Sequence, residues 1–389
     1  MRELLLILES ARGVGDLKQS GERIGVILSQ PIQWDLFLSL VLKHRVIPLV
    51  YKTLHDLKIQ SIPPYVMNFL KQEYEKNALK SLVLTGEMTK LIRLFRDRGV
   101  SSLVLKGAPL AEKIYQDVTF RMSKDIDLLV PWEDLSGAEK ILLAAGYEKK
   151  TTGFALTPRQ SRACLNKYHH HVYLNRDLKT CVELHWKMHQ IDLKFSPFLI
   201  NRRCIEVSGF SVPVLPDDEW VFFLMIHGSS HKWMRLHWLI DVERFFKCTK
   251  IDWDKIMELA EHSQTNLIIH QTILILDEIF QPDFPDWLIK VALRDKKAGR
   301  LAGEVIKHLF SPDEESTGIS VSYWKKFFTV HGYRYRIRTG WKNKLAYLHS
   351  LIQPIERDFQ FYPLPDSLYP LYYLIRPVTW LQRRIAGSR

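Results

Sequence analysis

Hydrophobic residues in the first quarter of the chain recur at helical spacing, for example over residues 34–42. A longer amphipathic pattern runs over residues 65–98. It ends at Gly99, a residue type that often terminates a helix, after a basic last turn. The pattern predicts that residues 1–98 form a helical region.

The pattern changes after Gly99 to short runs of β-branched and aromatic residues that are separated by turn residues. Two intervening segments, residues 106–116 and 132–145, have helical spacing, and the second closes at Gly146. The expected strands cover residues 101–105, 125–130, 147–152, 169–176, 180–186 and 210–215. The order strand, helix, strand, helix and then several strands predicts a small α/β unit.

Helical spacing returns at Pro216 and continues through about Phe280 towards the end of the chain. We therefore expect an N-terminal helical region over residues 1–98, an α/β core over residues 99–215 and a C-terminal helical domain over residues 216–389. The predicted fold class is α+β, with a small mixed sheet and flanking helices between two helical regions.

Composition restricts the partners more than it restricts the fold. The formal net charge of +12 favours anionic partners such as nucleoside triphosphates, nucleic acid or a membrane surface, although it can also serve solubility alone. The four cysteines form no CxxC pair, which argues against a zinc ribbon or a thioredoxin-like site. The N-terminus does not resemble a signal peptide and no run of about 18 apolar residues occurs, so we expect a cytoplasmic protein with reduced thiols.

The segment DIDLLV places two carboxylates two positions apart. Because side chains alternate along a strand, Asp125 and Asp127 are expected on one face, with Ile126 and Leu128 on the other. Two adjacent carboxylates repel each other unless a cation lies between them, and hard oxygen ligands suit Mg²⁺ or Mn²⁺. The alternative for a bare Asp-x-Asp is a solvated strand edge. Repulsion alone also predicts that Asn at either position leaves thermal stability unchanged or raises it.

Two neighbouring features favour a metal and phosphate site. Lys106 and Gly107 follow a strand and precede a helix, where glycine allows backbone N–H groups to approach a phosphate. Glu183 lies on a later strand and is expected close to Asp125 and Asp127. A third carboxylate there can complete a two-metal site or accept the proton of an attacking hydroxyl.

The segments LKG (105–107), DIDLLV (125–130) and VELHW (182–186) together resemble the uncharacterised bacterial nucleotidyltransferases of the DNA polymerase β nucleotidyltransferase superfamily. The resemblance extends from about His44, in HRVIPLVY, to Asp241. It implies that the α/β unit is a polymerase β-type nucleotidyltransferase core.

The resemblance also implies an enzyme that transfers a nucleoside monophosphate from an NTP to a hydroxyl-bearing acceptor. Asp125, Asp127 and Glu183 would be its catalytic and metal-binding residues, with Mg²⁺ or Mn²⁺ as cofactor and the NTP as donor. The acceptor, whether a small molecule, a peptide, a sugar, a protein or a tRNA, is not indicated. Ala108 departs from the superfamily pattern, in which a serine or glycine follows the glycine, so Lys106 is expected to take over part of the phosphate binding.

Two other functions stay open at this point. One keeps the metal site but transfers a phosphoryl group, as a kinase does. The other is a non-catalytic nucleotide-binding or RNA-binding module. Three intact carboxylates favour an enzyme, because binding alone does not need them.

The segment HGSSHKWMRLHWLIDV (227–242) is the second unusual stretch. If it forms one helix, one side of that helix carries His227, His231, Met234, Trp238 and Asp241, with Lys232 and Arg235 nearby. A zinc protease site would need a glutamate where Gly228 stands. The two other interpretations are a pair of core histidines and a contact to the base, ribose or phosphate, which the resemblance favours.

The expected nucleotide-binding residues are therefore Lys106, Gly107, Arg121, His227, His231 and Arg235. Arg121 is included because it lies four positions before Asp125, from where it can reach phosphate oxygens.

Two further segments carry weaker indications. Alternation along a strand is expected to place His170 opposite His169 and His171, which argues against a metal site made by this triplet, although one of the three could line the cleft. The C-terminal tail, with Trp380 and the pair 383–384, could make a weak contact with an anionic surface. Its alternative is a terminal helix that packs its aromatic residues on the core.

Overall fold

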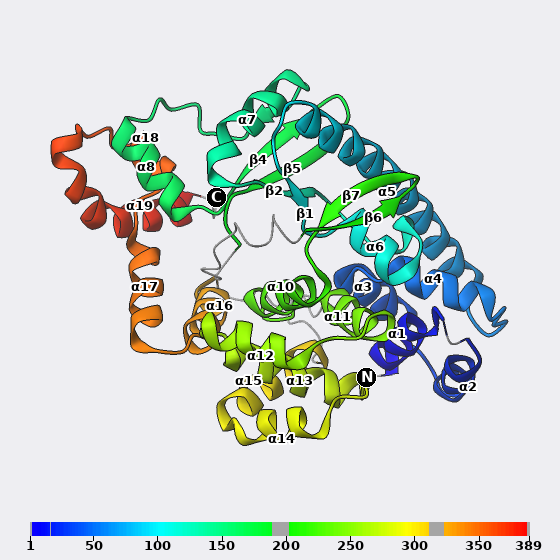
Figure 1. Ribbon diagram of the computed structural model, residues 1–389. Coiled ribbons are helices and arrows are strands. Elements are labelled where there is room, and N and C mark those ends of the chain that lie inside the picture. The colour runs from blue at the N-terminus through cyan, green and yellow to red at the C-terminus, as the bar shows by residue number, and fades with distance from the viewer. Residues whose placement is uncertain (1, 16, 189–201, 311–322, 387–389) are drawn as a thin grey trace.

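The structure is a computed structural model that describes residues 2–15, 17–188, 202–310 and 323–386 (Figure 1). It confirms the α+β fold class, with a small mixed sheet between helical regions. The N-terminal helices are α1 (Arg2–Gly13), α2 (Leu17–Leu28), α3 (Trp34–His44), α4 (Ile47–Asp56) and α5 (Pro64–Asp97). The long helix α5 ends as predicted, because Gly99 adopts a φ of +70° and its N–H donates to the carbonyl of Arg96.

The main sheet has five strands in the order β1-β2-β5-β4-β3. Strands β2 and β5 are parallel, and every other neighbouring pair is antiparallel. The elements of this region are β1 (Leu103–Val104), α6 (Ala108–Tyr115), β2 (Ile126–Leu129), α7 (Leu135–Ala144), β3 (Glu148–Lys149), α8 (Pro158–Lys167), β4 (His170–Asn175) and β5 (Thr180–His185). In the described part of the chain, the short 3-10 helices η1 (Val118–Phe120), η2 (Trp132–Asp134) and η3 (Asp366–Leu371) connect longer elements.

Two elements of this region were not expected from the pattern. Helix α8 has few apolar positions, but a capping box between Thr157 and Gln160 defines its start. Strand β6 (Arg203–Val207) is mostly exposed and pairs with β7 (Phe210–Val214) in a separate hairpin. The turn residues 208–209 both have positive φ, as two-residue hairpin turns require.

The C-terminal region is helical as predicted. It consists of α10 (Asp217–Ser230), α11 (Leu236–Cys248), α12 (Trp253–His262), α13 (Asn266–Phe280), α14 (Asp286–Arg294), α15 (Lys296–Phe310), α16 (Tyr323–Arg336), α17 (Trp341–Ile352), α18 (Glu356–Phe361) and α19 (Tyr372–Ala386). Figure 1 shows α10 to α15 on the side of the molecule opposite α7, with α17 to α19 to one side.

The expectation of one continuous helix over residues 227–242 is wrong. The chain breaks between α10 and α11, where Lys232 and Trp233 have φ values of +55° and +50°. Trp233 folds back over Gly228, and its N–H donates to the carbonyl of Gly228. A Cβ atom on Gly228 would lie 2.1 Å from the Trp233 ring, so the turn depends on glycine at this position.

Hydrophobic packing joins the helical regions to the sheet. One core cluster extends from Leu4 in α1 to Ile337 just after α16. A second cluster holds Phe359, Tyr369 and Tyr372 of the C-terminal helices against Cys164 of α8. None of the helices in the described part of the chain combines the length and the hydropathy needed to cross a bilayer.

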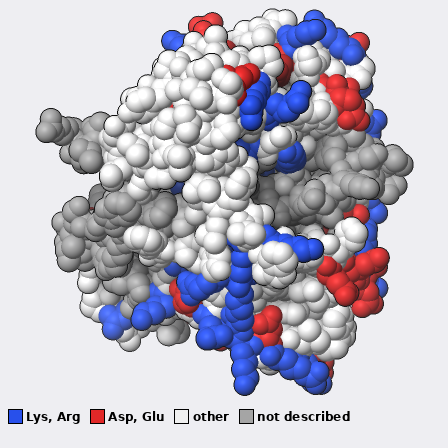
Figure 2. All heavy atoms as spheres, turned by 90° about the vertical axis from the view of Figure 1, so that its left-hand side faces the viewer, with Lys and Arg blue, Asp and Glu red and all other residues white. Residues whose placement is uncertain are grey.

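The C-terminal helix α19 is amphipathic and partly exposed. Leu374 is 74% exposed, whereas Tyr372 is buried and Trp380 lines a cavity beside Arg376 and Pro377. Figure 2 views the molecule from the side that carries α17 to α19. This side combines white areas, which hold no Lys, Arg, Asp or Glu, with Lys and Arg side chains in its lower half. The side chains of residues 383–384 lie outside the described part of the structure, so contact of this tail with an anionic surface stays a prediction.

Candidate active site

A cavity of about 400 Å³ lies between the main sheet and the link that joins α10 to α11. Its sheet wall is formed by Lys106, Asp125, Asp127, His169, His170, Glu183 and His185. Its helical wall is formed by Phe223, His227, His231, Arg235, His237 and Trp238, and the loop 121–124, Arg45 and Arg334 complete the lining. Of the predicted site residues, Gly107 alone is outside this lining; it starts α6 next to Lys106, with a φ of +88° that favours glycine.

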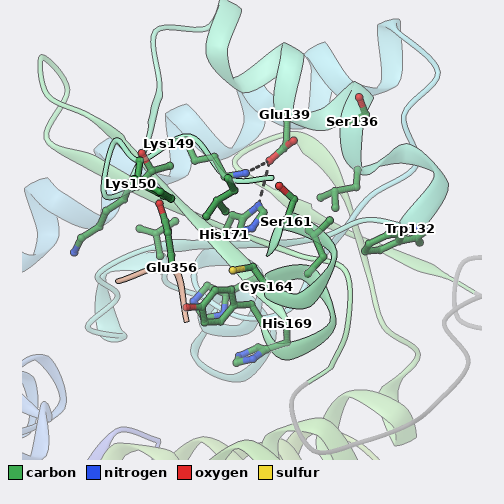
Figure 3. A pocket seen from close by; sticks show the side chains of 18 residues that line it. Trp132, Ser136, Glu139, Lys149, Lys150, Ser161, Cys164, His169, His171 and Glu356 are labelled. Carbon is green, nitrogen blue, oxygen red and sulfur yellow. Dashed lines mark hydrogen bonds and ion pairs between the residues drawn. The ribbon is translucent and has the colours of Figure 1, made fainter. Parts of the chain in front are cut away.

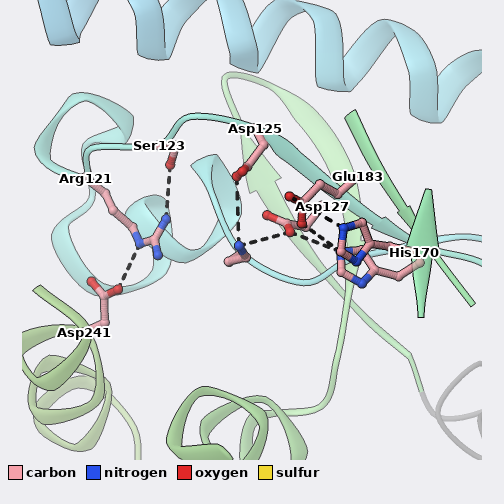
Figure 4. A network of polar contacts seen from close by, with 9 residues as sticks. Arg121, Ser123, Asp125, Asp127, His170, Glu183 and Asp241 are labelled. Atoms are coloured by element: carbon pink, nitrogen blue, oxygen red, sulfur yellow. Dashed lines mark hydrogen bonds and ion pairs between the residues drawn. The ribbon is translucent and has the colours of Figure 1, made fainter. Parts of the chain in front are cut away.

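The structure brings the three predicted carboxylates together. Asp127 lies in β2 and is paired in register with Glu183 of the parallel strand β5, while Asp125 directly precedes β2. Asp127 is only 1% exposed. In Figure 4, Asp127 lies between Asp125 and His170. Burial and the charge of Asp127 both raise the pKa of Asp125 above its ordinary value.

Lys106 interacts with carboxylates in this structure. Its Nζ lies 3.0 Å from Oδ1 of Asp127 and 3.9 Å from Oδ1 of Asp125. Burial alone would raise the pKa of Asp127, but the charge of Lys106 and the hydrogen bond from His185 lower it. Burial alone would lower the pKa of Lys106, but the two aspartates raise it. Lys106 therefore offsets part of the negative charge of the carboxylate pair.

His185 was not among the predicted site residues, yet it touches two of them. Its Nε2 lies 3.3 Å from Oδ1 of Asp127 and 3.4 Å from Oε2 of Glu183. Burial would lower the pKa of His185, but its hydrogen bonds to both carboxylates raise it. The alternation in VELHW placed His185 on the face of Glu183, and this was the signal in the sequence that could have identified it.

The histidine triplet departs from the predicted alternation. His169 and His170 both line the cavity, whereas Nδ1 of His171 lies 3.1 Å from Oε1 of Glu139 on the other side of the sheet. The physical reason is that β4 begins at His170, so the backbone at His169 is not yet part of the alternating strand. Burial and the nearby His185 lower the pKa of His170 to about 4.

The residues present fit a divalent cation. Asp127, Glu183 and His185 each offer a ligand atom, and these atoms lie within 4.8 Å of one another. The second oxygen of Asp127, Oδ2, is buried and has no hydrogen-bond partner among the described residues. A buried carboxylate oxygen without a donor is costly, and a bound cation would satisfy it.

The helical wall carries aromatic rings and cations instead of carboxylates. The ring of His231 stacks on Trp238 with centroids 5.0 Å apart, and His227 lies against both rings. The guanidinium of Arg235 lies 5.5 Å from the centroid of Trp238. Burial lowers the pKa of His231 to about 4 and holds the pKa of His227 well below its ordinary value, so both rings favour the neutral form.

Arg121 has a different position from the one expected of a phosphate ligand. Its Nε donates to Oδ2 of Asp241 at 3.0 Å, and its Nη1 donates to Oγ of Ser123 at 3.1 Å. Both Arg121 and Asp241 are buried, so the pair ties the loop before β2 to helix α11. The guanidinium edge that the carboxylate occupies is not available to a phosphate.

Other cations that the sequence did not single out face the cavity. Arg45 is one of them, and it belongs to HRVIPLVY, a segment that carried the family resemblance. Burial and the charge of Arg235 lower the pKa of Arg45 to about 10. The preceding His44 is buried and its Nδ1 accepts from the N–H of Leu236, so the same segment also positions the start of α11.

A second cavity of about 830 Å³ lies beside the first (Figure 3). His169 and His170 line both cavities. The second one is mixed in character, with apolar side chains such as Leu156 alongside charged ones such as Glu356. In its wall Glu139 accepts from Lys149 and lies beside His171.

Comparison with known proteins identifies a family for the segment that contains the cavity. Residues 30–281, which include the whole sheet and both walls of the cavity, match the family described as uncharacterised nucleotidyltransferase. No protein among those with curated descriptions matches the chain.

Solved structures show only remote similarity. The solution structure of the antibiotic-resistance factor ANT(2'')-Ia is 13% identical, with a TM-score of 0.31 over 46% of this chain and 92% of that one. The crystal structure of ANT(2'')-Ia in complex with adenylyl-2''-tobramycin is 12% identical, with a TM-score of 0.27 over 45% and 93% of the two chains. Similarity at this level carries no information about the activity of this chain. Because the family match spans more than half of its residues, the chain belongs to the uncharacterised nucleotidyltransferase family.

Proposed function

We propose that the protein transfers a nucleoside monophosphate from an NTP to a hydroxyl-bearing acceptor with the help of a divalent metal ion. The observation that carries the proposal is the placement of Asp125, Asp127 and Glu183 in one cavity, with the last two in register on parallel strands. Three carboxylates this close, with Asp127 buried, are unfavourable together unless a cation binds between them. Membership of the nucleotidyltransferase family supports the same reaction.

The metal would be held by Asp125, Asp127 and Glu183. A bound divalent cation offsets the negative charge of the triphosphate and of the departing pyrophosphate. Glu183 accepts the proton of the acceptor hydroxyl, and the hydroxyl oxygen forms a bond to the α-phosphorus. The bond from the α-phosphorus to the bridging oxygen breaks, and pyrophosphate leaves with its electron pair. His185 orients Glu183 through its contact with Oε2.

The nucleotide would lie across the cavity from the carboxylates. Arg45, Lys124 and Arg235 are the cations placed to bind phosphate oxygens. The stacked rings of His231 and Trp238 offer an apolar surface to a base or ribose.

The acceptor would occupy the second cavity. A cavity of about 400 Å³ is within the range that holds a single ligand, so two substrates need additional space. The cavity of about 830 Å³ adjoins the first at His169 and His170. A bulky side chain there, as in Ser161→Trp, is expected to abolish transfer while leaving NTP affinity unchanged. Loss of NTP affinity in this variant would place the nucleotide there instead.

The central test is a transfer reaction with the full-length protein, Mg²⁺ or Mn²⁺, and each NTP labelled at the α- or the γ-phosphate. Pooled metabolites, peptides and tRNA serve as acceptors, and pyrophosphate release is followed in parallel. We expect α-label in the product and pyrophosphate in solution. The matched control is Asp97→Asn, an exposed aspartate at the end of α5, against Asp127→Asn in the site.

The same reaction separates the alternatives. Transfer of the γ-label instead of the α-label would identify a kinase. Tight NTP binding without transfer of either label or release of pyrophosphate, in the presence of every acceptor pool, would identify a non-catalytic binding module.

A further inference from the structure

The carboxylate cluster has two chemically unlike ends. On the side of Asp125 the ion-pair partner is the ammonium of Lys106, and no histidine in the described part of the chain forms an ion pair with this carboxylate. On the side of Glu183 the neighbours are imidazole nitrogens of His185 and His170. Figure 4 shows this arrangement, with Asp127 between the two ends.

We propose that the end formed by Asp127, Glu183, His185 and His170 is a site for a divalent transition-metal ion, with Mg²⁺ bound there far more weakly. The proposal deepens the proposed function, because it assigns the chemical class of one metal at the same site. It rests on the ligand types and on their geometry.

Strand pairing brings these ligands together from three segments of the chain. Glu183 and His185 are two positions apart in β5 and share a face. His170 of β4 is paired in register with His185, and Asp127 of β2 is paired in register with Glu183. The ligands therefore lie on three adjacent strands, where hydrogen-bonded pairing holds them at fixed spacing.

The distances fit a shared cation better than they fit hydrogen bonds alone. Nε2 of His185 lies 3.3 Å from Asp127 and 3.4 Å from Glu183, and a single N–H cannot point well at both oxygens. Nε2 of His170 lies 4.0 Å from the other oxygen of Glu183. A cation bound among Asp127, Glu183 and His185 would interact with these three ligands, and His170 would approach it from the side of Glu183 and His185.

Two buried atoms at the site lack partners among the described residues. They are Oδ2 of Asp127 and Nδ1 of His170. The rings of His169, His170 and His185 are packed together, and their nitrogens form a second group whose ligand atoms lie within 4.8 Å of one another. The site thus offers more donor atoms than the hydrogen bonds of the metal-free protein use.

The ligand types then select the metal. Mg²⁺ prefers oxygen ligands and keeps its water, whereas imidazole nitrogen favours Zn²⁺, Co²⁺ and the other first-row transition metals. A set of two imidazoles and two carboxylates is therefore unsuited to Mg²⁺ and well suited to these ions. The end beside Asp125, where no histidine of the described residues pairs with the carboxylate, remains suited to Mg²⁺ bound with the triphosphate.

The test uses Co²⁺ as a spectroscopic probe on the full-length, metal-free protein without nucleotide. Visible absorption reports the coordination number and ligand set of Co²⁺, so its change in the histidine variants identifies imidazole ligands, and calorimetry compares the affinities for Co²⁺, Zn²⁺, Mn²⁺ and Mg²⁺. We expect Co²⁺ and Zn²⁺ to bind at least about tenfold more tightly than Mg²⁺. We expect His185→Gln and His170→Gln each to weaken Co²⁺ binding by about tenfold or more and to change its spectrum.

The matched control is His171→Gln, because this neighbour of His170 points to Glu139 on the other face of the sheet. It should leave Co²⁺ affinity and the spectrum unchanged. If His185→Gln does not fold, His170→Gln provides the same readout, since this side chain is only partly buried. An unchanged Co²⁺ spectrum in His170→Gln, or equal affinity of the wild type for Mg²⁺ and Co²⁺, overturns the proposal.

Failure of the histidine metal site can be distinguished from failure of the proposed nucleotidyl transfer. Co²⁺ binding is measured without substrate, so it can succeed when no nucleotidyl transfer is found. Conversely, transfer supported by Mg²⁺ together with an unaltered Co²⁺ spectrum in the histidine variants would keep the enzyme and overturn the histidine site.

Discussion

The two walls of the candidate active-site cavity differ in what holds their side chains. On the sheet wall, Lys106 and His185 each form an ion pair with Asp127, and each of the three comes from a strand or from the turn that follows one. On the helical wall, His231 and Trp238 are held by ring stacking at a break between two helices. The sheet wall is therefore suited to chemistry that needs fixed charges, and the helical wall to binding a flat, uncharged group.

The largest expected effect is the loss of transfer when either aspartate of the sheet wall is replaced. The two replacements should differ in their effect on stability. Asp125→Asn and Asp127→Asn should each reduce transfer by about a thousandfold or more, because each removes a metal ligand. Their thermal stabilities should differ. Asp127→Asn removes the nearer of the two carboxylate partners of both Lys106 and His185, so we expect a loss of roughly 1–3 kcal/mol. Asp125→Asn relieves repulsion and should leave stability unchanged or raise it.

Calorimetric melting of both variants without metal checks this difference. If charge repulsion alone acted on the two aspartates, both variants would have unchanged or raised melting temperatures. Equal melting temperatures for the two variants would therefore mean that Lys106 does not pair with Asp127 in solution, and wild-type turnover in either variant would remove that residue from the site.

The next effect concerns the cations around the cavity. Arg45→Gln and Arg235→Gln should each weaken NTP binding by about tenfold, since each removes a charge-assisted hydrogen bond to phosphate. The effect should appear mainly in KM for the NTP. Arg176→Gln is the control, because this arginine pairs with Glu148 at the exposed edge of the sheet. An unchanged KM in both cavity variants would mean that the phosphates lie elsewhere.

A smaller effect distinguishes two histidines of the helical wall. His231→Ala should weaken NTP binding severalfold with little change in melting temperature, because His231 is partly exposed in the cavity. His237→Ala should lower the melting temperature and leave NTP affinity nearly unchanged, since His237 is buried beside His44 and Arg121. If His231→Ala loses stability and keeps its affinity, His231 belongs to the core and not to the site.

The smallest effect is a change of stability with pH. Burial lowers the pKa of His231 to about 4, below the value of the unfolded chain, so the unfolded state takes up a proton first as the pH falls. Stability is therefore lost between about pH 6.5 and pH 4. His231→Gln should reduce this loss by about 1 kcal/mol at pH 5, after allowance for partial solvent screening. Urea unfolding of the wild type and of His231→Gln at pH 7 and pH 5 measures this loss of stability. An equal loss in the two proteins would mean that the pKa of His231 is not lowered by burial.

Local patterns were sufficient for much of the fold and for part of the site. The amphipathic period of α5, its end at Gly99 and the glycine turn at Gly107 depend on neighbouring residues, so the sequence predicted them directly. The shared face of Asp125 and Asp127 follows from strand alternation in the same way. The exposed strand β6 and the polar helix α8 were missed, because elements with little burial leave little hydrophobic pattern.

The sequence by itself indicated the segments that we propose to carry the chemistry, namely DIDLLV, the turn at Gly107 and VELHW. Tertiary structure decided which partners those groups meet. The break at Trp233 depends on packing over Gly228, and the pairing of Arg121 with Asp241 joins residues 120 positions apart. The contact of His185 with Asp127 depends on the register of β5 against β2. Periodicity describes one element at a time, whereas register and packing between elements arise only when distant segments compete for the same neighbours in the folded chain.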